Sequence, residues 1–172
     1  MNASHEVIAE MEGTATIPRE RVLRWLSEGD LRTRAAVYHL TVKALERIQP
    51  QMTMHQQCGF MADYLLECLK TVPGDPDAGV MSGFDAAWEL GVWMKHLKDM
   101  EAEPVISDLV LRLEKLFHQG DETLRNRIET GVLEHVLESK RMPPYFQHWQ
   151  ADPVLKDAHQ LCMQWALAHE EE

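Results

Sequence analysis

The fold of this chain is set by a helix junction that occurs twice, as Val22-Leu-Arg-Trp-Leu-Ser-Glu-Gly-Asp30 and as Leu113-Glu-Lys-Leu-Phe-His-Gln-Gly-Asp121. In each copy apolar residues recur every three or four positions, which is the spacing of one helix face. Glycine then ends the helix, and aspartate begins the next because its carboxylate accepts hydrogen bonds from free N–H groups. The motif predicts two tight αα-hairpins. Gly-Asp pairs are also common at unrelated helix junctions, so the two copies need not be a true repeat.

The same punctuation continues outward along the chain and predicts about seven helices. Apolar residues recur at helical spacing between proline, glycine and cap residues, and no segment alternates with a period of two over a strand's length. The predicted helices cover residues 18–28, 31–48, 54–72, 83–98, 104–119 and 122–139, and a last one begins at Asp152-Pro153. The chain is therefore expected to be all-α. Pairing the first six helices gives three antiparallel αα-hairpins, which could stack as an irregular HEAT-like array or form a compact bundle.

The length of 172 residues fits one domain spanning residues 1–172, with residues 1–16 left as a loosely attached N-terminal segment. The three cysteines, Cys58, Cys68 and Cys162, exclude a disulfide scaffold and favour a reducing compartment. No signal segment or apolar stretch of membrane length occurs. We therefore expect a cytoplasmic protein that does not enter a membrane.

The net charge of −11 argues against nucleic-acid binding, which requires clustered lysine and arginine side chains. The excess is concentrated in residues 59–108, which contain ten acidic and three basic residues. We predict that the hairpin of residues 54–98 gathers carboxylates into one acidic face that binds a protein partner. The candidate residues are Asp63, Glu67, Asp75, Asp77, Asp85, Glu89, Asp99, Glu101 and Glu103.

Two other interpretations of these carboxylates remain open. The face could simply be solvated and aid solubility, with Asp85 acting as a helix-start charge and Glu67 offset by Lys70. It could also bind a cation.

The aromatic linker after Pro143-Pro144 is a second candidate surface, in which Tyr145 and Trp149 could act as anchors for a partner. The alternative is that Tyr145, Phe146 and Trp149 close the end of the helical bundle.

The sequence predicts no catalytic residue, no metal site and no cofactor. His118 and Glu122, like His148 and Asp152, are four residues apart, but both pairs straddle predicted loops or caps and lack a third ligand. No Gly-x-Ser-x-Gly motif or glycine-rich phosphate loop occurs. We therefore expect a protein that is not an enzyme; a hydrolase that relies on a lone carboxylate remains the open exception.

Two helix-hairpin phrases, Ser82-Gly-Phe-Asp-Ala-Ala-Trp-Glu-Leu90 and Gly120-Asp-Glu-Thr-Leu-Arg-Asn-Arg-Ile-Glu-Thr-Gly-Val-Leu-Glu134, resemble bacterial immunity proteins that accompany polymorphic toxins, including Rhs and type VI secretion effectors. The resemblance covers about residues 53–168 and includes no catalytic signature. It implies a cytoplasmic antitoxin that binds one cognate toxin domain.

The charge pattern agrees with an inhibitor of this kind. A toxin domain that acts on nucleic acid, on NAD or on a nucleotide-binding protein has a basic cleft, and an acidic helical surface can occupy it. The leading hypothesis is therefore an immunity protein that blocks the active-site cleft of a basic toxin domain, such as a nuclease or ADP-ribosyltransferase. The alternatives are a helical-repeat adaptor or chaperone for another protein, and an enzyme that reverses a toxin's modification.

Overall fold

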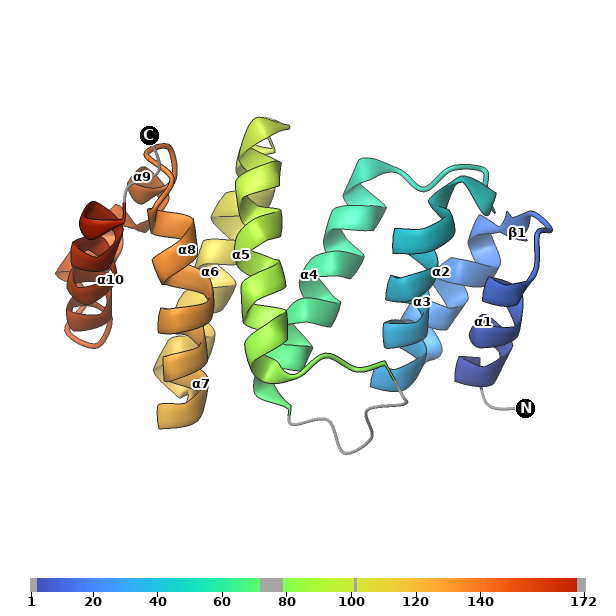
Figure 1. Cartoon of the computed structure of the whole chain (residues 1–172), viewed down its shortest axis with the longest axis horizontal. Helices are drawn as coiled ribbons and strands as arrows, with labels where there is room; N and C mark the ends of the chain where they lie inside the picture. The colour runs from blue at the N-terminus through green and yellow to red at the C-terminus, as the bar shows by residue number, and fades with distance from the viewer. Residues whose placement is uncertain (1–2, 72–78, 101, 170–172) are drawn as a thin grey trace. The chain divides into compact units, whose positions relative to one another are not determined.

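The computed structural model describes residues 3–71, 79–100 and 102–169, and the chain is all-α, as the sequence predicts (Figure 1). Its contacts gather into two compact units. Unit 1 comprises the described residues of Met1–Cys68 and Val72–Met81, and unit 2 comprises those of Leu69–Thr71 and Ser82–Glu172. Among the described helices, none combines the length and the apolar character needed to cross a membrane.

Unit 1 is built on helices joined by one short pair of strands. Its elements are α1 (Ala3–Glu12), β1 (Ile17–Pro18), α2 (Arg19–Glu28), α3 (Leu31–Ala44), the 3-10 helix η1 (Leu45–Arg47), β2 (Ile48–Gln49) and α4 (Met54–Lys70), whose last residues belong to unit 2. β1 and β2 run parallel with Ile17 opposite Ile48, and both side chains are buried.

Helix α1 lies within the segment that the sequence left as loosely attached. Its Val7 side chain is fully buried. The guanidinium of Arg21 on α2 pairs with Glu6 and Glu10 of α1, each at 2.5 Å. One arginine therefore joins two acidic side chains on successive turns of α1 to α2.

The two junction motifs that predict the hairpins adopt the same local geometry. Gly29 and Gly120 have φ values of −76° and −78°, so neither glycine is required by a left-handed backbone. A larger residue would not fit at either position. A Cβ added to the residue would lie 2.2 Å from the carbonyl oxygen four residues earlier at Gly29, and 2.8 Å from it at Gly120. Asp30 and Asp121 each accept a hydrogen bond at 2.9 Å from the backbone N–H three residues later. The predicted aspartate caps are confirmed.

Unit 2 contains the remaining helices. They are α5 (Gly83–Asp99), α6 (Glu103–Gln119), α7 (Glu122–Asn126), the π-helix η3 (Arg127–Leu133), α8 (Glu134–Leu137), α9 (Pro143–Phe146), the 3-10 helix η4 (Gln147–Ala151) and α10 (Lys156–Ala168). The predicted helix 122–139 is thus interrupted by a π-helical turn. The two helices of the predicted middle hairpin, 54–72 and 83–98, fall largely in different units, and α5 packs on η3, α8 and α6.

Helix α5 approaches the π-helix through small residues. A Cβ added to Gly131 would lie only 2.4 Å from the Cβ of Ala87, and Gly91 faces the carbonyl oxygen of Gly131. The two backbones can therefore come close only because Gly131 has no side chain. This contact fixes α5 beside η3 and α8 and so positions the side chains of the candidate site.

Candidate functional site

The predicted acidic residues are divided between the two units. Asp63 and Glu67 lie on α4 in unit 1, and the other described candidates lie in unit 2: Asp85, Glu89, Asp99 and Glu103. Asp75, Asp77 and Glu101 lie outside the described residues.

Three candidate residues, Asp99, Glu103 and Tyr145, lie where α5, α6 and α9 meet, but they pair with other side chains of unit 2. We call this set of contacts the clamp. The Lys98 ammonium lies 2.5 Å from the Glu103 carboxylate and donates to the Tyr145 hydroxyl at 3.1 Å. The Tyr145 hydroxyl in turn donates to Glu103, and Arg141 pairs with Asp99. Both carboxylates are thus paired with cations of unit 2, and each remains about half exposed.

Trp149 lies in the core of unit 2. Its ring is fully buried, 5.4 Å from the ring centroid of Phe146 and 6.1 Å from that of Phe117. A ring with no exposed surface cannot contact a partner in this conformation, so Trp149 corresponds to the alternative in which the linker aromatics close the bundle. Tyr145 is half-buried and belongs to the clamp.

A carboxylate cluster that the sequence analysis missed lies on η3 and α8. The N–H of Glu134 donates to the carbonyl oxygen of Glu129, which is the five-residue hydrogen bond of a π-helix. This turn stacks residues five apart, so Glu129 and Glu134 share one side of the helix. Glu138 follows one α-helical turn later. All three side chains are half-buried.

The local environment disfavours ionisation of two members of this cluster, Glu134 and Glu129. Burial raises the pKa of Glu134, and the nearby charges of Glu138 and Glu129 raise it further, against the opposing effect of His169. Burial also raises the pKa of Glu129, against the opposing charge of Arg125. Glu138 lies 3.9 Å from Nδ1 of His135. Carboxylates whose ionised form is disfavoured in this way are candidates for a functional site.

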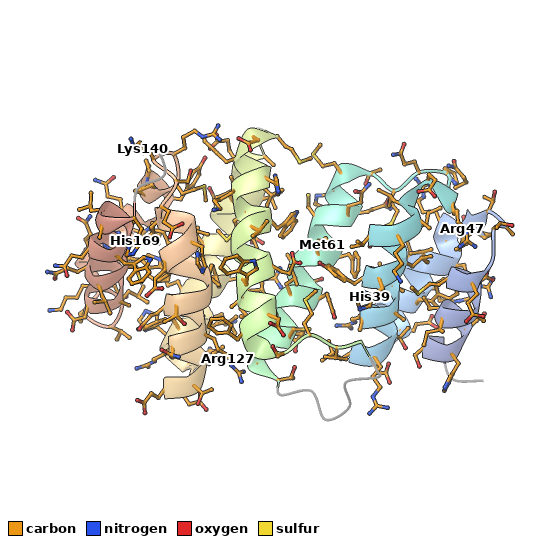
Figure 2. The ribbon with its side chains drawn as sticks, in the orientation of Figure 1. His39, Arg47, Met61, Arg127, Lys140 and His169 are labelled. Carbon is orange, nitrogen blue, oxygen red and sulfur yellow. The ribbon has the colours of Figure 1, made fainter. Side chains whose placement is uncertain are left out.

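Exposed tryptophans flank the cluster on both sides. Helix α8 lies between α5 and α10 in unit 2 (Figure 1). On α5, Trp88 is 49% exposed, and its ring centroid lies 4.1 Å from that of His135. On α10, Trp165 is 42% exposed and stacks on His169, which Figure 2 shows on the side of α10 toward α8.

We call this surface the Glu–Trp face; it consists of Trp88, Glu129, Glu134, His135, Glu138 and Trp165. The predicted Asp85 adjoins it, because it lies three residues before Trp88 on α5, whereas Glu89 directly follows Trp88 and does not face it. Asp85 also accepts a hydrogen bond from Ser82 at the helix start, as the capping alternative expected. Within the part of the chain that the structure describes, Glu89 has no ion-pair partner.

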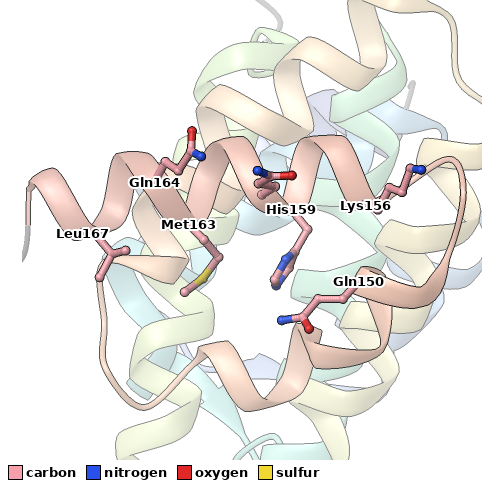
Figure 3. Close-up of a pocket in the computed structure, with 7 residues that line it drawn as sticks. Gln150, Lys156, His159, Met163, Gln164 and Leu167 are labelled. Atoms are coloured by element: carbon pink, nitrogen blue, oxygen red, sulfur yellow. The ribbon is translucent and has the colours of Figure 1, made fainter.

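A cavity of about 440 Å³ lies between η4 and α10 (Figure 3). The His159 side chain points into it beside Gln150 and is itself 4% exposed. Burial lowers the pKa of His159, and the charge of His148 adds to the effect, so the imidazole is neutral at pH 7. The lining contains amides, a lysine and aliphatic groups but no carboxylate. This cavity therefore lacks the carboxylates that would bind a basic group of a partner.

Two histidines and two carboxylates lie together between α6 and the η4 segment: Glu114, His118 and Asp152 converge, and His148 adjoins them through Glu114. His118 Nε2 lies 3.0 Å from Asp152 Oδ2, and His148 Nε2 lies 2.9 Å from Glu114 Oε2. The sequence analysis weighed His118 with Glu122 and His148 with Asp152; in the structure His118 pairs with Asp152 and His148 with Glu114. Sequence reasoning missed Glu114, although the spacing Glu114-x-x-x-His118 puts both on one side of a helix.

Comparison of this chain with known protein families, with curated proteins and with solved structures finds no match.

Proposed function

We propose that this chain is an immunity protein that binds a basic toxin domain through the Glu–Trp face and blocks its active-site cleft. One observation carries the proposal: three half-buried glutamates lie together between two exposed tryptophans. The class of partner follows from the resemblance of residues 82–90 and 120–134 to immunity proteins of polymorphic toxins.

The carboxylates of the Glu–Trp face favour a cationic partner group. Two of the glutamates have raised pKa values: burial raises the pKa of Glu129, and burial together with the charges of Glu138 and Glu129 raises that of Glu134. A lysine or arginine inserted among them would relieve that repulsion and form charge-assisted hydrogen bonds. The free protein therefore gives up some stability that a basic partner restores on binding.

The exposed tryptophans beside the glutamates provide the aromatic side chains of a binding hot spot. Interface energy is concentrated in tryptophan, tyrosine and arginine side chains, and an arginine can stack on an indole while pairing with a carboxylate. Trp88 and Trp165 supply large rings that lose little side-chain entropy on binding. The net charge of −11 would accelerate encounter with a basic domain, while these anchors would slow dissociation.

Blocking and enzymatic reversal differ in stoichiometry. A protein that fills a toxin's basic cleft must match the toxin one for one, whereas an enzyme that reverses a modification acts below one equivalent. Titrating the chain against the activity of the captured toxin separates them. The proposal predicts complete inhibition at one equivalent.

Affinity capture with a matched variant tests the proposal. The tagged chain is the bait at low salt, in extracts of the cells in which it occurs, and retained proteins are quantified by mass spectrometry. The face variant carries Trp88→Ala, Glu134→Gln and Glu138→Gln. The control removes the same charge and an exposed apolar side chain from unit 1, through Glu12→Gln, Val42→Ala and Glu46→Gln, all at exposed positions.

We expect one basic protein to be retained in stoichiometric amount by the wild type and by the control but not by the face variant. Retention by the face variant at the wild-type level would remove the Glu–Trp face from the account. Several weakly retained proteins in place of one partner would identify an adaptor instead.

A further inference from the structure

We propose that the cluster of two imidazoles and two carboxylates between α6 and η4 binds one zinc ion; its members are Glu114, His118, His148 and Asp152. This site is separate from the Glu–Trp face, and neither proposal depends on the other.

The distances among three members of the cluster, Glu114, His118 and Asp152, approach those of a zinc site. Zn–N and Zn–O bonds of about 2.0–2.1 Å in a tetrahedron put neighbouring ligand atoms about 3.3–3.4 Å apart. Two such separations are already near this value, at 3.0 Å for His118 with Asp152 and 2.9 Å for His148 with Glu114. The ligand atoms of Glu114, His118 and Asp152 all lie within 4.8 Å of one another. The longest of these separations would have to shorten by no more than about 1.5 Å. His148 lies outside this group of three and adjoins it through Glu114, so its imidazole would move toward the other two ligands when the metal binds.

The backbone and its neighbours orient the ligands. Glu114 and His118 lie one turn apart on α6, so both side chains leave the same side of the helix. Asp152 is held through its other oxygen, since Oδ1 accepts the N–H groups of Val154 and Leu155 at 2.8 and 3.1 Å. Oδ2 is thereby directed at His118. Hydrogen bonds of this kind, outside the ligands themselves, hold carboxylates in place at metal sites.

The donor set selects the class of metal. Two imidazole nitrogens with two carboxylate oxygens suit zinc and neighbouring transition metals, whereas magnesium and calcium prefer oxygen ligands alone. The four side chains are between a quarter and a half exposed, which leaves a path for the ion. Because two ligands come from α6 and two from the η4 segment, bound zinc would fasten that segment to α6 and stabilise unit 2.

Isothermal titration with ZnCl₂ after treatment with a chelator tests the site. His118→Ala and His148→Ala each remove one exposed ligand, and His55→Ala removes an exposed imidazole from α4 as the matched control. We expect one Zn²⁺ per wild-type chain with Kd below about 10 μM, and affinity weaker by about tenfold or more in each ligand variant. The control should bind like the wild type, and MgCl₂ should give no binding.

A second readout covers the case in which a ligand variant perturbs folding. The thermal midpoint of the wild type and of His55→Ala should rise with ZnCl₂ and return with EDTA, whereas that of His148→Ala should not respond. Far-UV circular dichroism checks that each variant is helical. Absence of stoichiometric zinc binding by the wild type, or equal binding by a folded variant lacking both His118 and His148, would overturn the proposal.

Discussion

Replacing Gly131 by alanine tests the contact that fixes α5 against the π-helix. The new Cβ would lie 2.4 Å from the Cβ of Ala87. Carbon atoms normally approach to about 3.5–4.0 Å, so the two backbones must separate by about an ångström or more. Overpacking of this kind costs up to about 3 kcal/mol, and alanine in place of glycine in a helix returns about 1 kcal/mol. We expect a net loss of about 2 kcal/mol in the free energy of unfolding.

Two further variants isolate the clash. A Cβ on Gly91 has no neighbour closer than 3.5 Å, so Gly91→Ala on the same interface should stabilise the protein by about 1 kcal/mol. Ala87→Gly removes the opposing methyl, after which the nearest atom to a Cβ at position 131 is the Cα of residue 87, at 3.5 Å. In the Ala87→Gly variant, Gly131→Ala should therefore raise the free energy of unfolding by about 1 kcal/mol instead of lowering it by about 2 kcal/mol. The coupling energy between the two substitutions is then about 3 kcal/mol.

Urea denaturation followed by tryptophan fluorescence measures these effects. Four of the five tryptophans belong to unit 2, so the signal reports mainly on that unit. The close approach of α5 and η3 would be refuted if Gly131→Ala destabilised the wild type and the Ala87→Gly variant equally.

Two other predictions concern ionisation and reactivity. The raised pKa of Glu134 means that the folded state holds its proton more tightly than the unfolded state, so its contribution to stability is present below the ordinary carboxyl pKa and is lost as pH rises through the raised value. Glu134→Gln should therefore stabilise the protein by about 0.5–1 kcal/mol at pH 7 and should have no measurable effect near pH 4. Urea denaturation at both pH values measures the change, and equal effects at both would show that ionisation of Glu134 is not the cause. Burial raises the pKa of all three buried cysteines, that of Cys162 to about 12 with a smaller contribution from Glu134 and Glu129. The native protein should thus react with Ellman's reagent at pH 8 only as fast as it unfolds, and a rapid reaction with one thiol equivalent would place a cysteine at the surface.

The fold was largely predictable because the signals that delimit these helices are local. Residues 83–98 and 104–119 were predicted, and the structure has Gly83–Asp99 and Glu103–Gln119. Proline, glycine and cap residues act within one turn, and so they can be read from sequence. The π-helix could not be found in this way, because no proline, glycine-stop or cap signal in the sequence marks a change from α-helical to π-helical hydrogen bonding. Helix α1 was missed because its few apolar residues give only a weak periodic pattern.

The candidate site was less predictable because charges along the chain do not reveal their partners in space. Asp99 and Glu103 belong to the most acidic segment, yet Arg141 and Lys98 pair with them. The spacing of Glu129 and Glu134 points to a shared face only once the π-helical turn is known. The exposure of aromatic side chains is equally hidden, since the sequence analysis chose Trp149 as a partner anchor and passed over Trp88, yet Trp149 is buried and Trp88 is exposed.

The dissociation constant of the captured partner tests the central claim most directly. It is measured by isothermal titration at low and at high salt for the wild type, the face variant and the unit 1 control. We expect a 1:1 complex whose affinity falls about 100-fold in the face variant, in keeping with the loss of a tryptophan anchor and two charge pairs, and by less than about twofold in the control. An affinity for the face variant equal to that of the wild type would show that the partner binds elsewhere and would contradict the account.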